Sequence, residues 1–194
     1  MRLFLAVELD EAVRRAAADT ARTLAAALDR QGIRRGIGWV APENLHFTLH
    51  FLGEVDEPTA RAVADRVSAP LSTAPFDLAL AGLGTFPSAG PPRVIWLGVA
   101  EGAGDLAAVH GEVGRRLEGL GVPLERRPFS AHLTLGRIKA PLGPRLKDAL
   151  ADASLVREAR CRVDHVTLFE SRLSPRGATY SVIATARLGY HQPS

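Results

Sequence analysis

The chain of 194 residues carries a formal net charge of +3 at pH 7, with 46% apolar and 23% charged residues. These values are ordinary for a globular protein, argue against general disorder, and suffice for one domain with a sizeable core. The single cysteine, Cys161, excludes an intrachain disulfide, and no apolar run approaches the roughly 20 residues of a membrane-spanning helix.

The residue pattern predicts strands and helices in mixed order. Strands are expected at residues 2–9, 45–52, 76–83, 93–99, within 126–138, at 160–173 and at 179–188, and helices at 11–30, 56–71, 105–120 and 144–153. Asp10 is the expected N-cap of the first helix, and residues 36–38 are expected to form a loop. This order favours an α+β fold of antiparallel or mixed sheet over a doubly wound parallel sheet. We expect residues 1–194 to form a single domain.

The apolar run at the start of the chain is too short for a signal peptide, because Leu3–Val7 leads directly into Glu8. We therefore expect a cytoplasmic protein with no membrane partner. All basic residues except Lys139 and Lys147 are arginines, which suit phosphate groups. A GC-rich coding sequence is the preferred explanation of the arginine excess as a whole, so only arginines beside a candidate site carry an argument.

One tetrapeptide pattern occurs twice. His46-Phe47-Thr48-Leu49 returns later in the chain as His132-Leu133-Thr134-Leu135, each time within a predicted strand. Because strand side chains alternate between faces, the histidine and threonine share one face and the two apolar residues share the other. The repeat predicts two related lobes, each contributing one strand to a shared cleft. The alternative interpretation is two ordinary strands with half-exposed polar residues.

Two imidazoles and two hydroxyls suit chemistry at phosphorus. Histidine has an ordinary pKa of about 6.5, so one ring can accept a proton from water while another donates a proton to a departing oxygen. Threonine hydroxyls can bond the non-bridging phosphate oxygens. The candidate catalytic residues are His46 and His132, and Thr48 and Thr134 are candidate substrate-binding residues.

The paired His-x-Thr-Leu motifs resemble the two-histidine (2H) phosphoesterase superfamily. Within it, the chain is similar to the RNA 2',3'-cyclic phosphodiesterases, which were once called 2'-5' RNA ligases. The resemblance covers nearly the whole length and rests on blocks in the family's order: residues 2–6, 39–53, 92–96, 129–137 and 177–188.

The resemblance implies a bilobal α+β fold with two pseudo-symmetric lobes of mainly antiparallel sheet, helices outside and the active-site cleft between them. It implies hydrolysis of a terminal 2',3'-cyclic phosphate on RNA 3' ends or nucleotides to a 2'-phosphomonoester, with no metal and no cofactor. His46 would donate a proton to the 3'-oxygen and His132 would accept one from water, although the sequence alone does not separate these roles. We expect a monomer.

Two other activities remain open from the sequence. ATP-independent 2'-5' ligation of tRNA halves would use the same residues in reverse. A non-catalytic module that holds RNA ends or nucleotides is the third interpretation, although both histidines and both threonines are intact.

Arg137 matches the family's phosphate-contacting arginine, yet strict alternation places it on the opposite face from His132. A bulge at Gly136 would re-aim the arginine, and a surface role at a strand end is the alternative. By the same alternation, His50 would share a face with His46 and line the cleft rim, although a polar strand residue is the preferred interpretation.

Three aromatic side chains are candidates for stacking on a nucleobase, as in readers of single-stranded RNA. Phe4 is favoured by the resemblance over Trp39 and Phe51, although core packing is the preferred interpretation for each. His46 and His50 are four residues apart, as in a zinc-binding helix, but no glutamate follows His46 and the segment is a predicted strand, so we expect no metal site.

Overall fold

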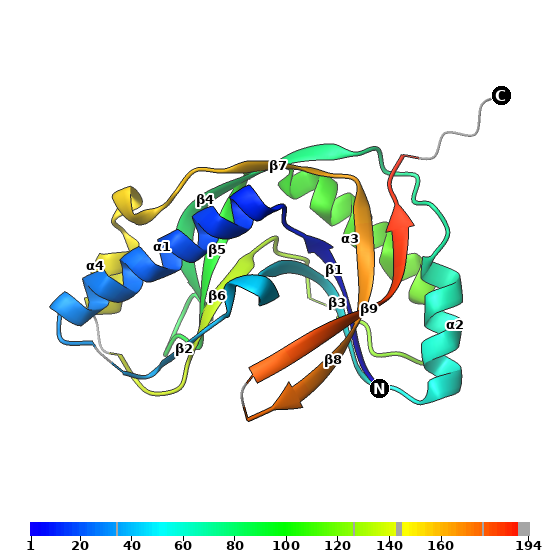
Figure 1. Ribbon diagram of the computed structural model, residues 1–194, viewed down its shortest axis with the longest axis horizontal. Helices are drawn as coiled ribbons and strands as arrows, with labels where there is room; N and C mark the ends of the chain where they lie inside the picture. Colours follow the sequence, from blue (N-terminus) through cyan, green and yellow to red (C-terminus); the bar gives the residue numbers. More distant parts are fainter. Residues whose placement is uncertain (34, 126, 143–144, 176, 190–194) are drawn as a thin grey trace.

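The computed structural model describes residues 1–33, 35–125, 127–142, 145–175 and 177–189 (Figure 1). The helices are α1 (Glu11–Arg30), α2 (Glu57–Val67), α3 (Ala103–Leu117) and α4 (Arg145–Leu150), with short 3₁₀ turns η1 (Pro42–Asn44) and η2 (Ala153–Leu155). The strands are β1 (Arg2–Glu8), β2 (Ile37–Trp39), β3 (His46–Glu54), β4 (Phe76–Phe86), β5 (Val94–Glu101), β6 (Leu133–Ile138), β7 (Arg160–Val163), β8 (His165–Ser174) and β9 (Gly177–Arg187). Arg126, Pro144 and Arg176, which fell within or beside predicted elements, lie outside the described residues.

The strands form two sheets. Sheet A has the order β3-β1-β8-β9 and sheet B the order β2-β6-β5-β4-β7, and each neighbouring pair is antiparallel. Three strands of sheet A (β3, β1, β8) and three of sheet B (β6, β5, β4) occupy equivalent places, with one His-x-Thr-Leu motif on β3 and the other at β6. This confirms the predicted α+β class and its two related lobes.

In each lobe, one helix packs against the sheet of the other lobe. The helix α1 follows β1 of sheet A but packs on β6 and β7 of sheet B, beside α4 (Figure 1). The helix α3 follows β5 of sheet B but packs on β3 of sheet A, beside α2. The predicted N-cap is confirmed, because the Asp10 carboxylate accepts a hydrogen bond from the Val13 amide at 2.8 Å. No helix within the described ranges is long and apolar enough to span a membrane.

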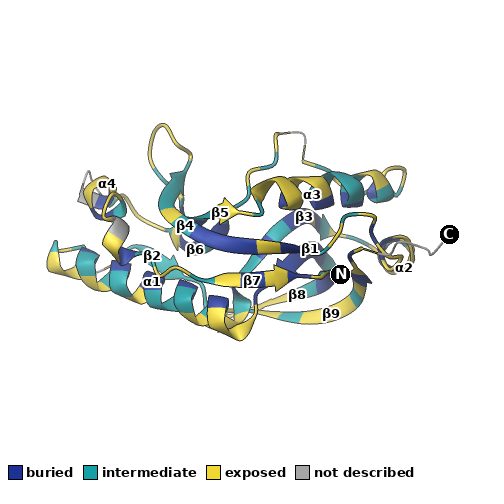
Figure 2. Cartoon of the chain, turned by 90° about the horizontal axis from the view of Figure 1, so that it is seen from above, coloured by how far each residue is buried: buried dark blue, intermediate teal, exposed yellow. Residues whose placement is uncertain are grey.

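A common core joins the two sheets. The middle of β1 is buried throughout, from Leu3 to Val7. The first half of β4 is mostly buried as well, and Figure 2 shows it mainly in dark blue. The largest cluster of buried apolar side chains includes Leu5 and Phe47 of sheet A together with Leu97 and Leu135 of sheet B. The two lobes therefore bury apolar surface together, which stabilises their relative placement.

Some predicted boundaries are wrong. The expected strand 160–173 divides at Asp164 into β7, which pairs with β4 of sheet B, and β8, which pairs with β1 and β9 of sheet A. Part of the expected loop 36–38 forms β2, which pairs with β6. His132 lies immediately before β6 and not within it. Pairing partners that are distant in the sequence decide such points.

Candidate active site

Both motif histidines make the same backbone contact. Nδ1 of His46 lies 2.7 Å from the carbonyl oxygen of Asn44, and Nδ1 of His132 lies 2.7 Å from the carbonyl oxygen of Ser130. In each case the partner is two residues earlier. A carbonyl oxygen only accepts, so Nδ1 carries the hydrogen and each Nε2 is left for other partners. The two motif histidines therefore share one tautomer as well as one sequence pattern.

Aromatic side chains hold both imidazoles in place. The His46 ring packs on Phe4, with 4.8 Å between ring centroids, and meets Tyr180 edge-on at 5.4 Å. The His132 ring packs edge-on against Phe86 at 4.9 Å. Phe4, a candidate for stacking on substrate, is only 3% exposed, and it lies directly against His46. Its side chain therefore fixes the orientation of the histidine.

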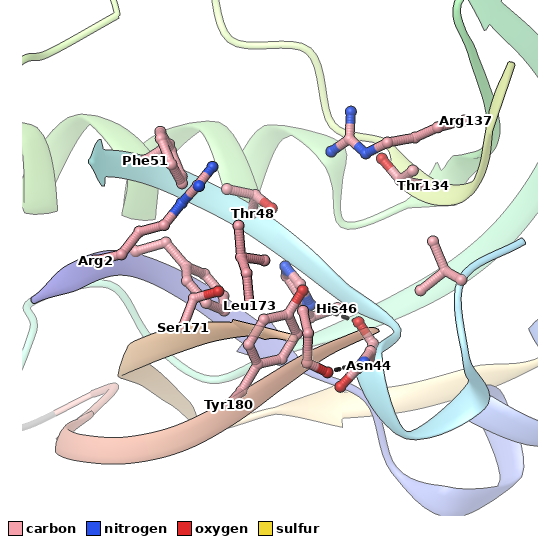
Figure 3. A pocket seen from close by; sticks show the side chains of 13 residues that line it. Arg2, Asn44, His46, Thr48, Phe51, Thr134, Arg137, Ser171, Leu173 and Tyr180 are labelled. Carbon is pink, nitrogen blue, oxygen red and sulfur yellow. Dashed lines mark hydrogen bonds between the residues drawn. The ribbon is translucent and has the colours of Figure 1, made fainter. Parts of the chain in front are cut away.

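A cavity of about 430 Å³ opens between the two sheets beside His46 (Figure 3). Sheet A contributes residues of β1, β3, β8 and β9, and sheet B contributes two residues of β6. The lining residues are Arg2, Phe4, Val40, Asn44, His46, Thr48, Phe51, Thr134, Arg137, Ser171, Leu173, Ala178 and Tyr180. The cavity therefore brings together His46, Thr48, Thr134, Arg137 and Phe4, five of the six predicted site residues.

His132 is not among the residues that line this cavity. It is partly exposed and lies two residues before Thr134, separated from it by the fully buried Leu133. In extended chain this spacing places the histidine and the threonine on the same side of the backbone. The second motif thus enters the cavity through Thr134 and Arg137.

A bulge follows the threonine of each motif. In β3, Thr48 pairs with Ala6 and His50 with Leu5, so Leu49 is the extra residue. In β6, Thr134 pairs with Trp96 and Gly136 with Ile95, so Leu135 is the extra residue. A bulge reverses the alternation of faces that follows it. The register shift expected near Gly136 is therefore present, and Arg137 turns into the cavity with Thr134.

The same bulge corrects two expectations for the first motif. His50 does not share the face of His46; it is 5% exposed and points to the opposite side of β3. Phe51, for which core packing was preferred, is 50% exposed and lines the cavity. Strict alternation across the motif predicts the wrong face for His50, because a bulge in β3 leaves no clear mark in the sequence.

The remaining lining residues had no role in the sequence-based interpretation, and two of them carry polar groups on the outer strands. Arg2 and Tyr180 reach the cavity from β1 and β9. Both lie in blocks that carried the family resemblance, residues 2–6 and 177–188, which was the available signal. Among the described residues, no group of three or more His, Cys, Asp or Glu side chains is arranged to hold a metal ion.

Comparison with known proteins accounts for the repeated site. A family model described as LigT like Phosphoesterase matches the chain twice in succession, at residues 12–96 and 97–180, and each match contains one His-x-Thr-Leu motif. The chain belongs to the LigT-like phosphoesterase family. The RNA 2',3'-cyclic phosphodiesterase of Archaeoglobus fulgidus is 36% identical over 180 residues, which cover 93% of this chain and 96% of the relative. That of Methanocaldococcus jannaschii is 34% identical over 184 residues, which cover 94% and 98%.

Solved structures share the fold of this chain. The crystal structure of TT0787 of Thermus thermophilus has a TM-score of 0.72 and 32% identity, with 99% of this chain and all of that chain (100%) covered. The E. coli LigT structure in apo form has a TM-score of 0.68 with 97% and 98% covered, and at 22% identity this likeness bears on the fold alone. The resemblance expected from the two motifs is confirmed.

In the LigT-like cavity, the pKa of His46 depends on the charges around it, including the charge of a bound ligand. Burial lowers the pKa of His46 below its ordinary value of 6.5, because desolvation disfavours the imidazolium. The hydrogen bond to Asn44 and the carboxylate of Glu8 raise this pKa, and the Arg137 guanidinium lowers it. His46 is therefore mostly neutral at neutral pH in the free protein, and an anion in the cavity would favour its protonated form.

A stack of rings beneath the site joins the two motifs. Nε2 of the buried His50 donates to the carbonyl oxygen of His110 at 2.8 Å, and the two imidazoles stack with 4.1 Å between centroids. His110 stacks in turn on Phe129 at 4.5 Å. Phe129 immediately precedes Ser130, whose carbonyl oxygen accepts from His132. The stack therefore connects β3, which carries His46, with the segment that positions His132.

We predict that this stack makes the LigT-like fold sensitive to acid. Burial and the neighbouring His50 lower the pKa of His110 to about 4, and burial also lowers that of His50. Unfolded histidine has a pKa of about 6.5, so the unfolded chain binds more protons below that pH and stability falls as the pH drops toward 4. His110→Phe keeps a ring and removes one proton site, so its urea midpoint should fall less between pH 7 and pH 4.5 than that of the wild type. Equal losses in the two proteins would contradict the prediction.

Proposed function

We propose that this LigT-like chain is an RNA 2',3'-cyclic 3'-phosphodiesterase, which hydrolyses a terminal 2',3'-cyclic phosphate to a 2'-phosphomonoester. Relatives that bear the name RNA 2',3'-cyclic phosphodiesterase match it over nearly its whole length. The structural observation that carries the proposal is the equivalent backbone contact of His46 and His132. Each donates Nδ1–H to a backbone carbonyl and keeps Nε2 for proton transfer.

In the proposed reaction, a water oxygen attacks phosphorus opposite the 3'-oxygen, and the bond from phosphorus to the 3'-oxygen breaks. Nε2 of His132 accepts the proton from water, and protonated Nε2 of His46 donates its proton to the 3'-oxygen. The hydroxyls of Thr48 and Thr134 donate hydrogen bonds to the non-bridging oxygens, and Arg137 balances their negative charge. The product carries a 2'-phosphate and a free 3'-hydroxyl.

We further propose that residues 1–194 act as one bilobal domain and as a monomer in the cytoplasm, on RNA 3' ends or on nucleotides. The core shared between the sheets and the exchange of α1 and α3 support a single unit. In this proposal water is the only co-substrate, and no metal or cofactor takes part.

Removal of either histidine is expected to lower kcat by on the order of 10²–10⁴, the usual contribution of a general acid or base. The variants are His46→Ala and His132→Ala, assayed with an oligonucleotide that ends in a 2',3'-cyclic phosphate. Unfolding midpoints of both variants control for loss of fold. Activity near the wild-type level in either variant would contradict its proton-transfer role.

The same assay, run with EDTA, separates the alternatives. Loss of the cyclic phosphate with no change in strand length indicates hydrolysis. A longer strand indicates 2'-5' ligation, and tight binding without any product indicates a binding module. Turnover that vanishes with EDTA and returns with zinc would contradict the metal-independent reaction.

Arg137→Ala is expected to lower kcat/KM by roughly 10- to 150-fold, the effect of losing a hydrogen bond to a charged group. Arg137→Lys keeps the positive charge without the planar guanidinium, so its kcat/KM should lie between those of the wild type and Arg137→Ala. Arg162→Ala is the matched control, because Arg162 is exposed on β7, pairs with Asp77 and lies outside the cavity. Equal activities of Arg137→Ala and Arg162→Ala would remove Arg137 from the site.

The pH profiles of kcat/KM and kcat should report different pKa values for His46, one for the free protein and one for the substrate complex. As the acid, His46 must be protonated, so kcat/KM should fall as pH rises through its lowered pKa in the free protein. The bound phosphate is negative and raises this pKa, so the alkaline limb of kcat should lie at higher pH than that of kcat/KM. Steady-state kinetics from pH 5 to pH 9 check this, and limbs in the reverse order would contradict the assignment.

A further inference from the structure

The positive charge of the chain is concentrated in three stretches of the sequence. Residues 30–42, 78–100 and 126–142 contain no aspartate or glutamate, although the chain has 21 acidic residues. The remainder of the chain, with 16 basic and 21 acidic residues, carries a net charge of −5, so the three stretches carry +8 of the overall +3. Their eight basic residues are Arg30, Arg34, Arg35, Arg93, Arg126, Arg127, Arg137 and Lys139.

The fold gathers these stretches in one lobe. They include β2, most of β5 and all of β6, which are neighbours in sheet B in the order β2-β6-β5 (Figure 1). Backbone hydrogen bonds join them at the end of β6. The Lys139 amide donates to the carbonyl oxygen of Gly36 at 2.6 Å, and the Ile138 amide donates to that of Arg93 at 2.8 Å. Segments that are distant in the sequence therefore meet beside the strand that carries Arg137.

Lys139 lies on the same face of sheet B as Arg137. Gly38 pairs with Arg137 across β2 and β6, so a side chain at residue 38 would share the face of Arg137. The Lys139 side chain occupies that space, because its Cε and Nζ atoms lie 2.7 and 3.1 Å from the position that a Cβ atom at residue 38 would take. Arg137 lines the cavity, so the Lys139 ammonium lies just beyond the cavity wall.

Arg93 lies on the other side of β6, close to the second motif histidine. Its amide donates to the carbonyl oxygen of Phe86 at 2.7 Å, which closes the loop between the two residues. The Phe86 ring packs against His132 with 4.9 Å between ring centroids. A second cation is thereby fixed near the site, on the strand next to Arg137.

These cations are not neutralised by the protein. Arg93, Arg137 and Lys139 are exposed, and in the part of the chain that the structure describes no ion pair involves any of them. Exposed arginines elsewhere do pair: Arg15 and Arg61 contact carboxylates one turn earlier in α1 and α2. Like charges held close together repel one another, so this arrangement favours a ligand with several negative charges.

The opposite side of His46 has a different charge. A second cavity, of about 440 Å³, also borders His46 and carries the carboxylates of Glu8 and Glu43, with Arg14 as its cation. A polyanion that extends out of the first cavity therefore meets carboxylates on this side and unpaired cations beyond Arg137. Electrostatics select the second direction.

We propose that Arg93 and Lys139 form a phosphate track that binds the RNA strand on the 5' side of the nucleotide with the cyclic phosphate. The proposal rests on the proposed phosphodiesterase activity and extends the substrate contacts beyond the cavity. Contacts to backbone phosphates carry no sequence information. The phosphate track therefore holds any RNA 3' end and makes a polynucleotide a better substrate than a mononucleotide.

The test compares uridine 2',3'-cyclic phosphate with a five-nucleotide oligouridine that ends in the same group, because only the oligonucleotide has upstream phosphates. The logarithm of kcat/KM should fall more steeply with the logarithm of salt concentration for the oligonucleotide, by about 0.7 for each phosphate bound. Lys139→Ala and Arg93→Ala should each lower this slope by about 0.7 and lower kcat/KM at 50 mM salt by about 5- to 10-fold. Neither change should affect the mononucleotide.

Two variants serve as controls. Lys139→Arg keeps the charge and should retain the wild-type slope. Lys147→Ala removes the same charge from an exposed position on α4, which packs on α1 outside the cavity lining, and should leave both substrates unaffected.

Equal losses on both substrates would place the two residues in the cleavage site, and an unchanged oligonucleotide slope would send the strand elsewhere; both results overturn the phosphate track. Loss of binding to phosphatidylglycerol vesicles with unchanged oligonucleotide kinetics would assign the surface to a membrane and also overturn it. If the wild type cleaves neither substrate, the proposed activity fails. Fluorescence anisotropy with an oligouridine that ends in a 2'-phosphate then decides: a smaller salt slope in Lys139→Ala supports the phosphate track, and an equal slope overturns it.

Discussion

The extra residue that follows the motif threonine in β3 and in β6 decides which side chains reach the cavity. Each bulge comes directly after the threonine of a His-x-Thr-Leu motif, and each reverses the faces of the residues that follow. Arg137 and Phe51 thereby turn toward the cavity, and His50 turns into the protein interior. Two small departures from regular pairing thus assemble the chemistry of the site from otherwise ordinary strands.

The carbonyl contacts of the histidines complete this arrangement. A backbone oxygen is a fixed acceptor that never changes protonation, so it holds Nδ1–H of His46 and of His132 throughout a proton transfer at Nε2. Burial beside Phe4 favours the neutral form of His46, and the nearby Arg137 favours it too. An anionic ligand would act in the opposite direction, so an anion in the cavity would favour the protonated form of His46.

The two halves of the chain repeat a scaffold and then depart from it. Equivalent strands, exchanged helices and equivalent histidine contacts give the molecule its approximate symmetry. Phe51 and Arg137 break that symmetry at matching positions, as do the supports of the two imidazoles, Phe4 and Tyr180 for His46 against Phe86 for His132.

The sequence alone determined the α+β class, the Asp10 cap, the repeated motif and the family, because these depend on local pattern and on order along the chain. It also named five residues that line one cavity, His46, Thr48, Thr134, Arg137 and Phe4. Tertiary structure decided the division of residues 160–173 between two sheets, the burial of His50 and the exposure of Phe51. Those outcomes depend on which strands pair and where an extra residue falls in the ladder, and backbone pairing is set by partners distant in sequence that no local pattern records.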